Sequence, residues 1–168
     1  MKTKISLLCL VCLVFSALLF LVSCSESDPD DGPDPTDLPD KTFTLNQLSL
    51  ILTEGFSLEI EGGTAILRAS TIVVFVDRLD FSSMAGAADL PLLTYAKDYS
   101  DKATESDGLV LLEYSTSGAS GSQSYAYFTA FYKSAGAFYT LQFACRAELY
   151  TVYREVFVKW AKSAVPTA

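Results

Sequence analysis

The side chains that could do acid–base chemistry in this chain are carboxylates, because the sequence contains no histidine. Histidine is the commonest general base and a very common metal ligand, so the simplest catalytic and metal-binding arrangements are excluded. Glu59 and Glu61 alternate with apolar residues, which predicts that both lie on the solvent face of a strand. Asp77 and Asp80 flank the expected end of another strand, where they could meet a ligand. The sequence shows no phosphate-binding glycine loop and no nucleophile–base pair, so we predict a protein that is not an enzyme, with no metal site and no cofactor.

The cysteines have different surroundings in the sequence. Cys9 and Cys12 lie in an apolar N-terminal run, and Cys24 lies at its end. Cys145 is then the only cysteine in the part expected to fold, so we predict no intramolecular disulfide. Its place on the apolar side of an alternating segment predicts a small buried hydrophobic residue. A nucleophilic role for Cys145 would require a base partner, and the chain has no histidine to supply one.

The N-terminus has the three parts of a secretory leader. Lys2 and Lys4 precede an uncharged apolar run over residues 5–22, which predicts a signal peptide over residues 1–23. The segment Leu21-Val22-Ser23-Cys24 resembles a bacterial lipobox, in which the cysteine is acylated after cleavage. The resemblance implies that Cys24 carries lipid, palmitate among its acyl chains, and that the chain is anchored to a membrane. The alternative is an uncleaved anchor, because the run reaches the lower length limit for a spanning helix.

Residues 24–40 have the composition of a tether. The stretch 25–40 contains seven acidic residues, four prolines and no basic residue. Such a stretch buries little apolar surface, so we expect it to stay extended and to make no core contacts. Acidic residues directly after a lipidated cysteine resemble the surface-export signal of Bacteroidetes lipoproteins, and the alternative is a plain spacer. The expected location is the outer membrane of a Gram-negative bacterium, either surface-exposed or facing the periplasm. The aspartates at 28–31 do not have EF-hand spacing, so we reject a calcium loop.

Charge narrows the possible partners further. The net charge is −8, and most of the excess negative charge lies in the tether. Nucleic-acid binding requires a basic face, so we predict no nucleic-acid partner.

Residues 41–168 are expected to form a single α+β domain. Tyr139, Leu141, Phe143 and Cys145 alternate on one face of a strand. The next segment changes to helical spacing, with an apolar stripe that includes Val152, Tyr153, Val156 and Trp160. A second helix is expected after Asp89 and Pro91, with Asp89 as its cap. The expected strands are 48–52 and 56–60 around a turn at 53–55, then 72–76, 109–114 and 125–133. We predict an antiparallel sheet of about five to six strands covered by helices.

One family resembles this pattern. The segment Gly136-x-Phe138-Tyr139-x-Leu141-x-Phe143, followed by Tyr150-x-x-Tyr153-Arg154-Glu155-x-Phe157-x-Lys159, resembles the end of PsbP-like domains. The segment from Gly55 to Ile60 is similar to their first hairpin, although Gly62 and Gly63 stand where that family has proline and tryptophan. The resemblance implies an α-β-α sandwich and little about activity.

Two functions follow as expectations. The first is a non-catalytic binding or adaptor module of the cell envelope, with another envelope protein as its partner. The alternative is a protein that binds a small ligand or glycan on a tyrosine-rich sheet face. An unrecognised hydrolase using carboxylates is a third and weaker reading.

Overall fold

The structure is a computed structural model that describes residues 34–61, 64–117 and 123–167. The predicted signal peptide, Cys24 and most of the predicted tether lie outside these residues. In the described part, no helix has both the length and the apolar composition needed to span a membrane.

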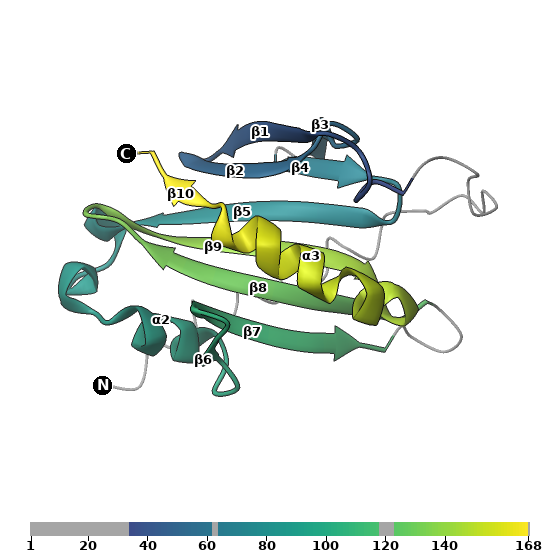
Figure 1. Ribbon diagram of the computed structural model, residues 1–168. Helices are drawn as coiled ribbons and strands as arrows, with labels where there is room; N and C mark the ends of the chain where they lie inside the picture. The colour runs from purple at the N-terminus through teal and green to yellow at the C-terminus, as the bar shows by residue number, and fades with distance from the viewer. Residues whose placement is uncertain (1–33, 62–63, 118–122, 168) are drawn as a thin grey trace. The chain divides into compact units, whose positions relative to one another are not determined.

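A seven-stranded antiparallel sheet forms the frame of the domain (Figure 1). Its spatial order is β3-β4-β5-β9-β8-β7-β6, so the two longest pairings join β9 to β5 and to β8. The strands are β3 (Ser57–Glu61), β4 (Thr64–Ala69), β5 (Ile72–Asp80), β6 (Thr104–Ser106), β7 (Leu109–Thr116), β8 (Tyr125–Lys133) and β9 (Ala137–Arg146).

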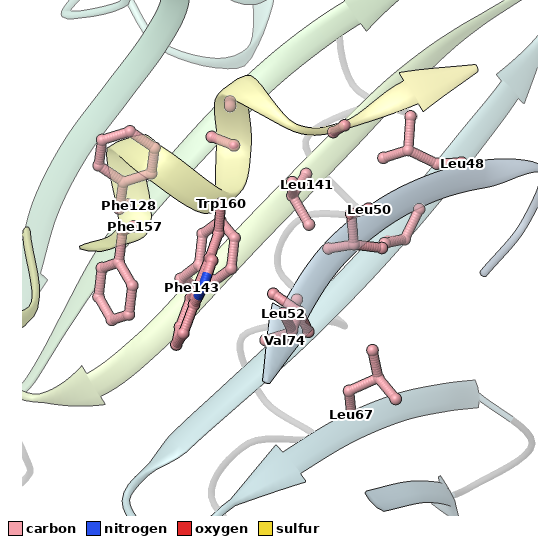
Figure 2. Packing of buried hydrophobic residues seen from close by; sticks show 14 of the residues in the cluster. Leu48, Leu50, Leu52, Leu67, Val74, Phe128, Leu141, Phe143, Phe157 and Trp160 are labelled. Carbon is pink, nitrogen blue, oxygen red and sulfur yellow. The ribbon is translucent and has the colours of Figure 1, made fainter. Parts of the chain in front are cut away.

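A second, three-stranded antiparallel sheet joins the two ends of the described chain. It has the order β1-β2-β10, where the strands are β1 (Asp40–Leu45), β2 (Leu48–Thr53) and β10 (Val165–Pro166). The leucines Leu48, Leu50 and Leu52 of β2 point into the core, toward Leu141 of β9 and Val74 of β5 (Figure 2). The small sheet therefore helps to cover one face of the large one.

The helices cover opposite faces of the large sheet. Helix α3 (Tyr150–Lys162) packs on β8 and β9 and buries Tyr153, Phe157 and Trp160 (Figures 1 and 2). Helix α2 (Leu92–Tyr99) packs on β7 and β8 and buries Tyr95 and Ala96 in a second cluster. Between β5 and α2 the chain makes two short 3₁₀ turns, η2 (Phe81–Ser83) and η3 (Ala87–Asp89), and a third, η4 (Ala147–Leu149), precedes α3.

The α+β class and the antiparallel sheet covered by helices are thus confirmed, and the sheet is larger than expected. The alternation in β9 is confirmed, because Tyr139, Leu141, Phe143 and Cys145 all lie in one buried cluster. Strand β8 has apolar residues on both faces because both faces are covered: Phe128 belongs to the α3-side cluster and Phe131 to the α2-side cluster.

The two strands expected around a turn at 53–55 are present as β2 and β3, but they do not pair with each other, because they belong to different sheets. Two other local predictions are wrong. Val152 is 66% exposed, because the buried stripe of α3 is rotated toward Phe157 and Ala161. Asp89 does not cap α2, because it ends the preceding 3₁₀ turn and Pro91 takes the N-cap position.

The last residues of the predicted tether contact the domain, which differs from the expectation of no contacts. Pro35 is buried, and its carbonyl oxygen accepts a hydrogen bond from Thr53 Oγ1 at 2.5 Å. The backbone N–H of Glu54 donates to the carbonyl of Pro39 at 2.8 Å. A Cβ atom at Gly55 would lie only 2.7 Å from Leu38 Cδ1, so a larger residue here would displace the end of the Leu38 side chain. Residues 34–40 therefore pack against the turn that follows β2.

Candidate functional site: a sheet-face cluster and a cleft beside the β6–β7 hairpin

The carboxylates considered for catalysis are not brought together. Glu59 lies on the outer strand β3 and forms an ion pair with Arg68 Nε at 3.0 Å, and Glu61 ends the same strand. Asp80 Oδ1 pairs with Arg78 Nη2 at 2.6 Å. Asp77 lies three residues earlier in β5, so it belongs to the opposite face of the strand from Asp80. No group of three or more Cys, Asp or Glu residues in the described part has metal-site geometry.

Cys145 is a core residue. Its side chain is 1% exposed, and burial raises the pKa of the thiol to about 11. A thiol with a raised pKa in apolar surroundings carries little thiolate at neutral pH and is a poor nucleophile. The expected small buried hydrophobic role therefore agrees with its environment.

Tyr132 and Tyr139 pack in the core on the α3 face, whereas Tyr114 and Tyr127 lie on the α2 face, where β7 ends and β8 begins. The rings of Tyr114 and Tyr127 stack with a centroid distance of 4.7 Å and an interplanar angle of 11°. Gln142 of β9 donates from Nε2 to Tyr114 Oη and to Thr129 Oγ1, both at 3.0 Å. By contrast, Tyr139 is fully buried, and Tyr132 donates from its hydroxyl to the carbonyl of Ala161 at 2.7 Å.

Asp77 extends this polar group across the sheet. Asp77 is directly opposite Thr140 in the β5–β9 ladder, and Gln142 is opposite Phe75, so these side chains share the α2 face. Burial raises the pKa of Asp77 above its ordinary value. The hydroxyl of Thr140 is buried and has no hydrogen-bond partner within the described residues. We call Asp77, Thr140, Gln142, Thr129, Tyr114 and Tyr127 the sheet-face cluster.

A cleft of about 710 Å³ lies beside the β6–β7 hairpin. The turn of this hairpin is formed by Asp107 and Gly108. Their φ values are 57° and 76°, the positive angles that a tight two-residue hairpin turn needs. The cleft is lined by Leu92, Glu105, Ser106, Asp107, Gly108, Leu109, Val110, Phe131, Tyr132, Lys133 and Pro166.

Lys133 is fixed at the wall of this cleft. Its Nζ donates to the carbonyls of Ala88 and Leu90 at 2.7 and 2.8 Å. The ammonium also lies over the rings of Phe81 and Phe138, at 5.6 and 5.4 Å from the centroids. Lys133 therefore holds the segment before α2 against the sheet.

A polar cluster joins α3 to β7 on the opposite face, beside the hairpin. Arg154 Nη2 lies 2.7 Å from Glu113 Oε1 and 3.2 Å from Asp107 Oδ2, so one guanidinium links the helix to the strand and to the turn. Tyr150 Oη donates to Glu113 Oε2 at 2.6 Å. Burial alone would raise the pKa of Glu113, but the hydrogen bonds from Arg154 and Tyr150 lower it overall. Burial and then the Glu113 hydrogen bond raise the pKa of the Tyr150 hydroxyl.

Sequence reasoning missed the Glu113 cluster and the cleft. One signal was present: Glu113 interrupts the apolar alternation that begins at Leu109 and Leu111, and Tyr150 and Arg154 are one helical turn apart. Nothing in the sequence states that these two segments cross, so the pairing could not be predicted.

Comparison with known proteins adds a likeness to solved structures. No protein-family model matches the chain, and no curated protein matches it. The solution structure of cyanobacterial PsbP from Synechocystis sp. PCC 6803 is similar, with 10% sequence identity and a TM-score of 0.47 over 84% of this chain and 98% of that one. The fold described above rests on the strand pairing of this chain, and we take nothing about activity or partners from this likeness.

Proposed function

We propose that the chain is a lipid-anchored module of the cell envelope that acts by binding and not by catalysis. Its anchor is Cys24, at the end of the apolar leader, and its location is the outer membrane of a Gram-negative bacterium. The acidic residues after Cys24 support display on the cell surface, and a periplasm-facing domain is the alternative. The partner is another envelope protein.

The observation that carries the binding role is the cleft beside the β6–β7 hairpin. Its volume of about 710 Å³ falls within the usual range of ligand sites, and it combines apolar walls such as Leu92 and Phe131 with polar groups from Glu105 and Ser106. The Arg154–Asp107 ion pair and the Lys133 contacts brace the walls on both sides. Rigid walls reduce the ordering cost of binding, which suits a recognition site.

The anchor is tested by metabolic labelling with palmitate. The wild-type protein is expected to incorporate label, and Cys24→Ala is expected to incorporate none. Equal labelling of the two proteins would contradict lipid attachment at Cys24. Added protease then separates the two locations, because it can digest a surface-exposed domain in intact cells and cannot reach one that faces the periplasm.

The cleft is tested by placing a photo-crosslinking amino acid at position 106, in the cleft wall, in living cells. We expect a discrete cross-linked adduct from position 106. Position 97 is the matched control, because Lys97 is exposed on α2 and does not line the cleft. Adducts of equal yield from the two positions would contradict a partner site in the cleft.

A second candidate is a glycan or small polar ligand on the sheet-face cluster. The stacked Tyr114–Tyr127 pair, with Gln142 and Asp77 on the same face, favours it, because sugars are bound by aromatic rings flanked by hydrogen-bonding groups. Titration calorimetry with a panel of glycans tests this candidate. A ligand of this site should lose most of its affinity to Tyr114→Ala and keep more of it with Tyr114→Phe, which preserves the ring.

A further inference from the structure

Strand β3 is an outer strand of the seven-stranded sheet, and no described residue pairs with its free edge. An outer strand presents a row of backbone N–H and C=O groups that can pair with another chain. Proteins commonly protect such edges with lysine, proline, a bulge or a very short strand. β3 has five residues, Ser57–Glu61, and contains neither lysine nor proline.

The apolar side chains of β3 are in solvent. Phe56, just before the strand, is buried and packs against Trp160, but Leu58 and Ile60 are 61% and 67% exposed. They are the most exposed large aliphatic residues of the large sheet in the described part. The sequence predicts Leu58 and Ile60 as the apolar face of a strand, and the described residues of the chain leave both side chains uncovered.

Glu59, one of the two acidic residues of β3, has its counter-charge within the same chain. Glu59 lies between Leu58 and Ile60 on the opposite face of the strand, and its Oε2 is 3.0 Å from Arg68 Nε on β4. A carboxylate that already has its counter-charge opposes a like charge less strongly than an unpaired one. The charge of Glu59 is therefore a reduced barrier to strand pairing.

We propose that β3 pairs antiparallel with β3 of a second copy of this chain, about a two-fold axis at Glu59. In this register Leu58 of one copy is opposite Ile60 of the other, and the same pair forms a second time by symmetry. Cross-strand pairs of large aliphatic residues stabilise a sheet. Each Glu59 faces the Glu59 of the other copy, a like-charge pair that is unfavourable by itself, and the Arg68 paired with each Glu59 offsets this repulsion. The contact uses the same patch on both copies and therefore closes as a dimer.

A second copy fits this edge better than an unrelated strand, because the pattern of β3 is symmetric about Glu59. The neighbours on either side of Glu59 are both large and aliphatic, and the residues beyond them, Ser57 and Glu61, are both polar. Pairing a strand with itself in this register puts apolar opposite apolar and polar opposite polar. A shift by one residue in the register would break both matches.

Single cysteines test the register in the full chain within the cell envelope. Directly opposed residues of antiparallel strands have Cα atoms about 4.5–5.5 Å apart, within the range that a disulfide spans. Glu59→Cys should therefore give a disulfide-linked dimer after mild oxidation. Ser57→Cys is the matched control on the same face of the same strand. Its two copies would lie four residues out of register, about 13 Å apart, too far for a disulfide. The native Cys145 is buried and does not compete. The thiol of Cys24 is blocked by acylation under the proposed function.

A third protein separates specific pairing from chance collision. This protein carries Glu59→Cys together with Leu58→Thr and Ile60→Thr. The two threonines favour a strand as the native residues do, but they remove the apolar pairs across the interface. We expect several-fold less cross-linked dimer in this protein than in Glu59→Cys alone, with unchanged circular dichroism. A lack of dimer with Glu59→Cys, or equal dimer with Ser57→Cys, would overturn the proposal. Equal dimer with and without the two threonines would overturn it as well.

Discussion

Arg154 and Glu113 join α3 to β7 through three close contacts: Nη2 to Oε1 at 2.7 Å, and Nε to Oε1 and Oε2, both at 3.2 Å. The two residues are 41 positions apart in the chain. Their side chains are 30% and 28% exposed, so solvent screens the pair only in part. The hydroxyl of Tyr150 adds a further bond to the same carboxylate. This contact therefore fixes how the last helix sits on the sheet.

Replacing Glu113 by Gln should reduce the free energy of unfolding by about 1 to 2 kcal/mol, the range for losing a charge-assisted hydrogen bond after discounting for partial exposure. Urea denaturation at neutral pH measures this loss. Glu155→Gln is the control, because Glu155 pairs with the same arginine at 3.3 Å but is 84% exposed. We expect little change in that variant, and equal losses in the two would argue against a special role for Glu113.

The contribution of Glu113 should disappear in acid. Its pKa in the folded protein lies below the ordinary value of 4.5, so its carboxylate stabilises the fold fully above that value. As pH falls below the ordinary value and through the lower folded pKa, the folded protein must take up the proton and the advantage is lost. The difference in unfolding free energy between wild type and Glu113→Gln should therefore shrink on acidification. A difference that stays constant from neutral to acidic pH would contradict the lowered pKa.

Trp160→Ala should destabilise the domain far more than Lys159→Ala. Trp160 is 1% exposed and contacts the rings of Phe56 and Phe143 at centroid distances of 5.4 and 5.9 Å. Removing a buried large aromatic side chain costs about 3–5 kcal/mol. Lys159 has only a 3.5 Å ion pair with Asp40 in solvent, and such substitutions usually stay within about 0.5 kcal/mol. Circular dichroism must follow both variants, because Trp160 is the only tryptophan. Coincident denaturation midpoints would mean that α3 does not close the core.

Removing residues 34–40 should lower the melting temperature. A chain that begins at Lys41 loses buried Pro35 and the hydrogen bonds from Thr53 and Glu54 to Pro35 and Pro39. A chain that begins at Pro33 keeps them and should melt like a chain that begins at Ser25. At about 1 kcal/mol for each lost hydrogen bond, the shorter chain should melt several degrees lower. Identical melting temperatures for all three chains would show that residues 34–40 do not stabilise the domain.

Lys133→Met should loosen the segment before α2. The substitution keeps the apolar length and removes the donors to Ala88 and Leu90, together with the contact to the Phe81 ring. Hydrogen exchange in residues 81–90 should become faster, because local protection depends on such tertiary contacts. Lys97→Met is the control on exposed α2, and equal acceleration there would mean that the Lys133 contacts do not hold the segment.

Sequence patterns predicted the parts of the fold in which apolar residues recur at the spacing of a strand or a helix. The alternation from Tyr139 to Cys145 and the helical placement of Tyr153 and Trp160 were sufficient to predict β9, α3 and their shared core. Strand β6 could not be predicted, because its three residues are all polar and exposed and it exists through pairing with β7. Only part of the sheet-face cluster was predicted, because tyrosines on a sheet face were expected. Gln142 and Asp77 join them through the register of β5 and β9, which no local sequence pattern contains.

The pairing of β2 with β10 has a consequence for the order in which the chain can fold. Val165 pairs with Ser49, and the backbone N–H of Thr167 donates to the carbonyl of Gln47 at 2.9 Å. The side chain of Ser163 also bonds the backbone of Ile51, which is 112 positions away. These contacts close a loop of nearly the whole domain, and closing such long loops slows folding. β1 and β2 pair over six residues and can form a local hairpin early, but the third strand of their sheet can be added only after Val165 and Pro166 are present.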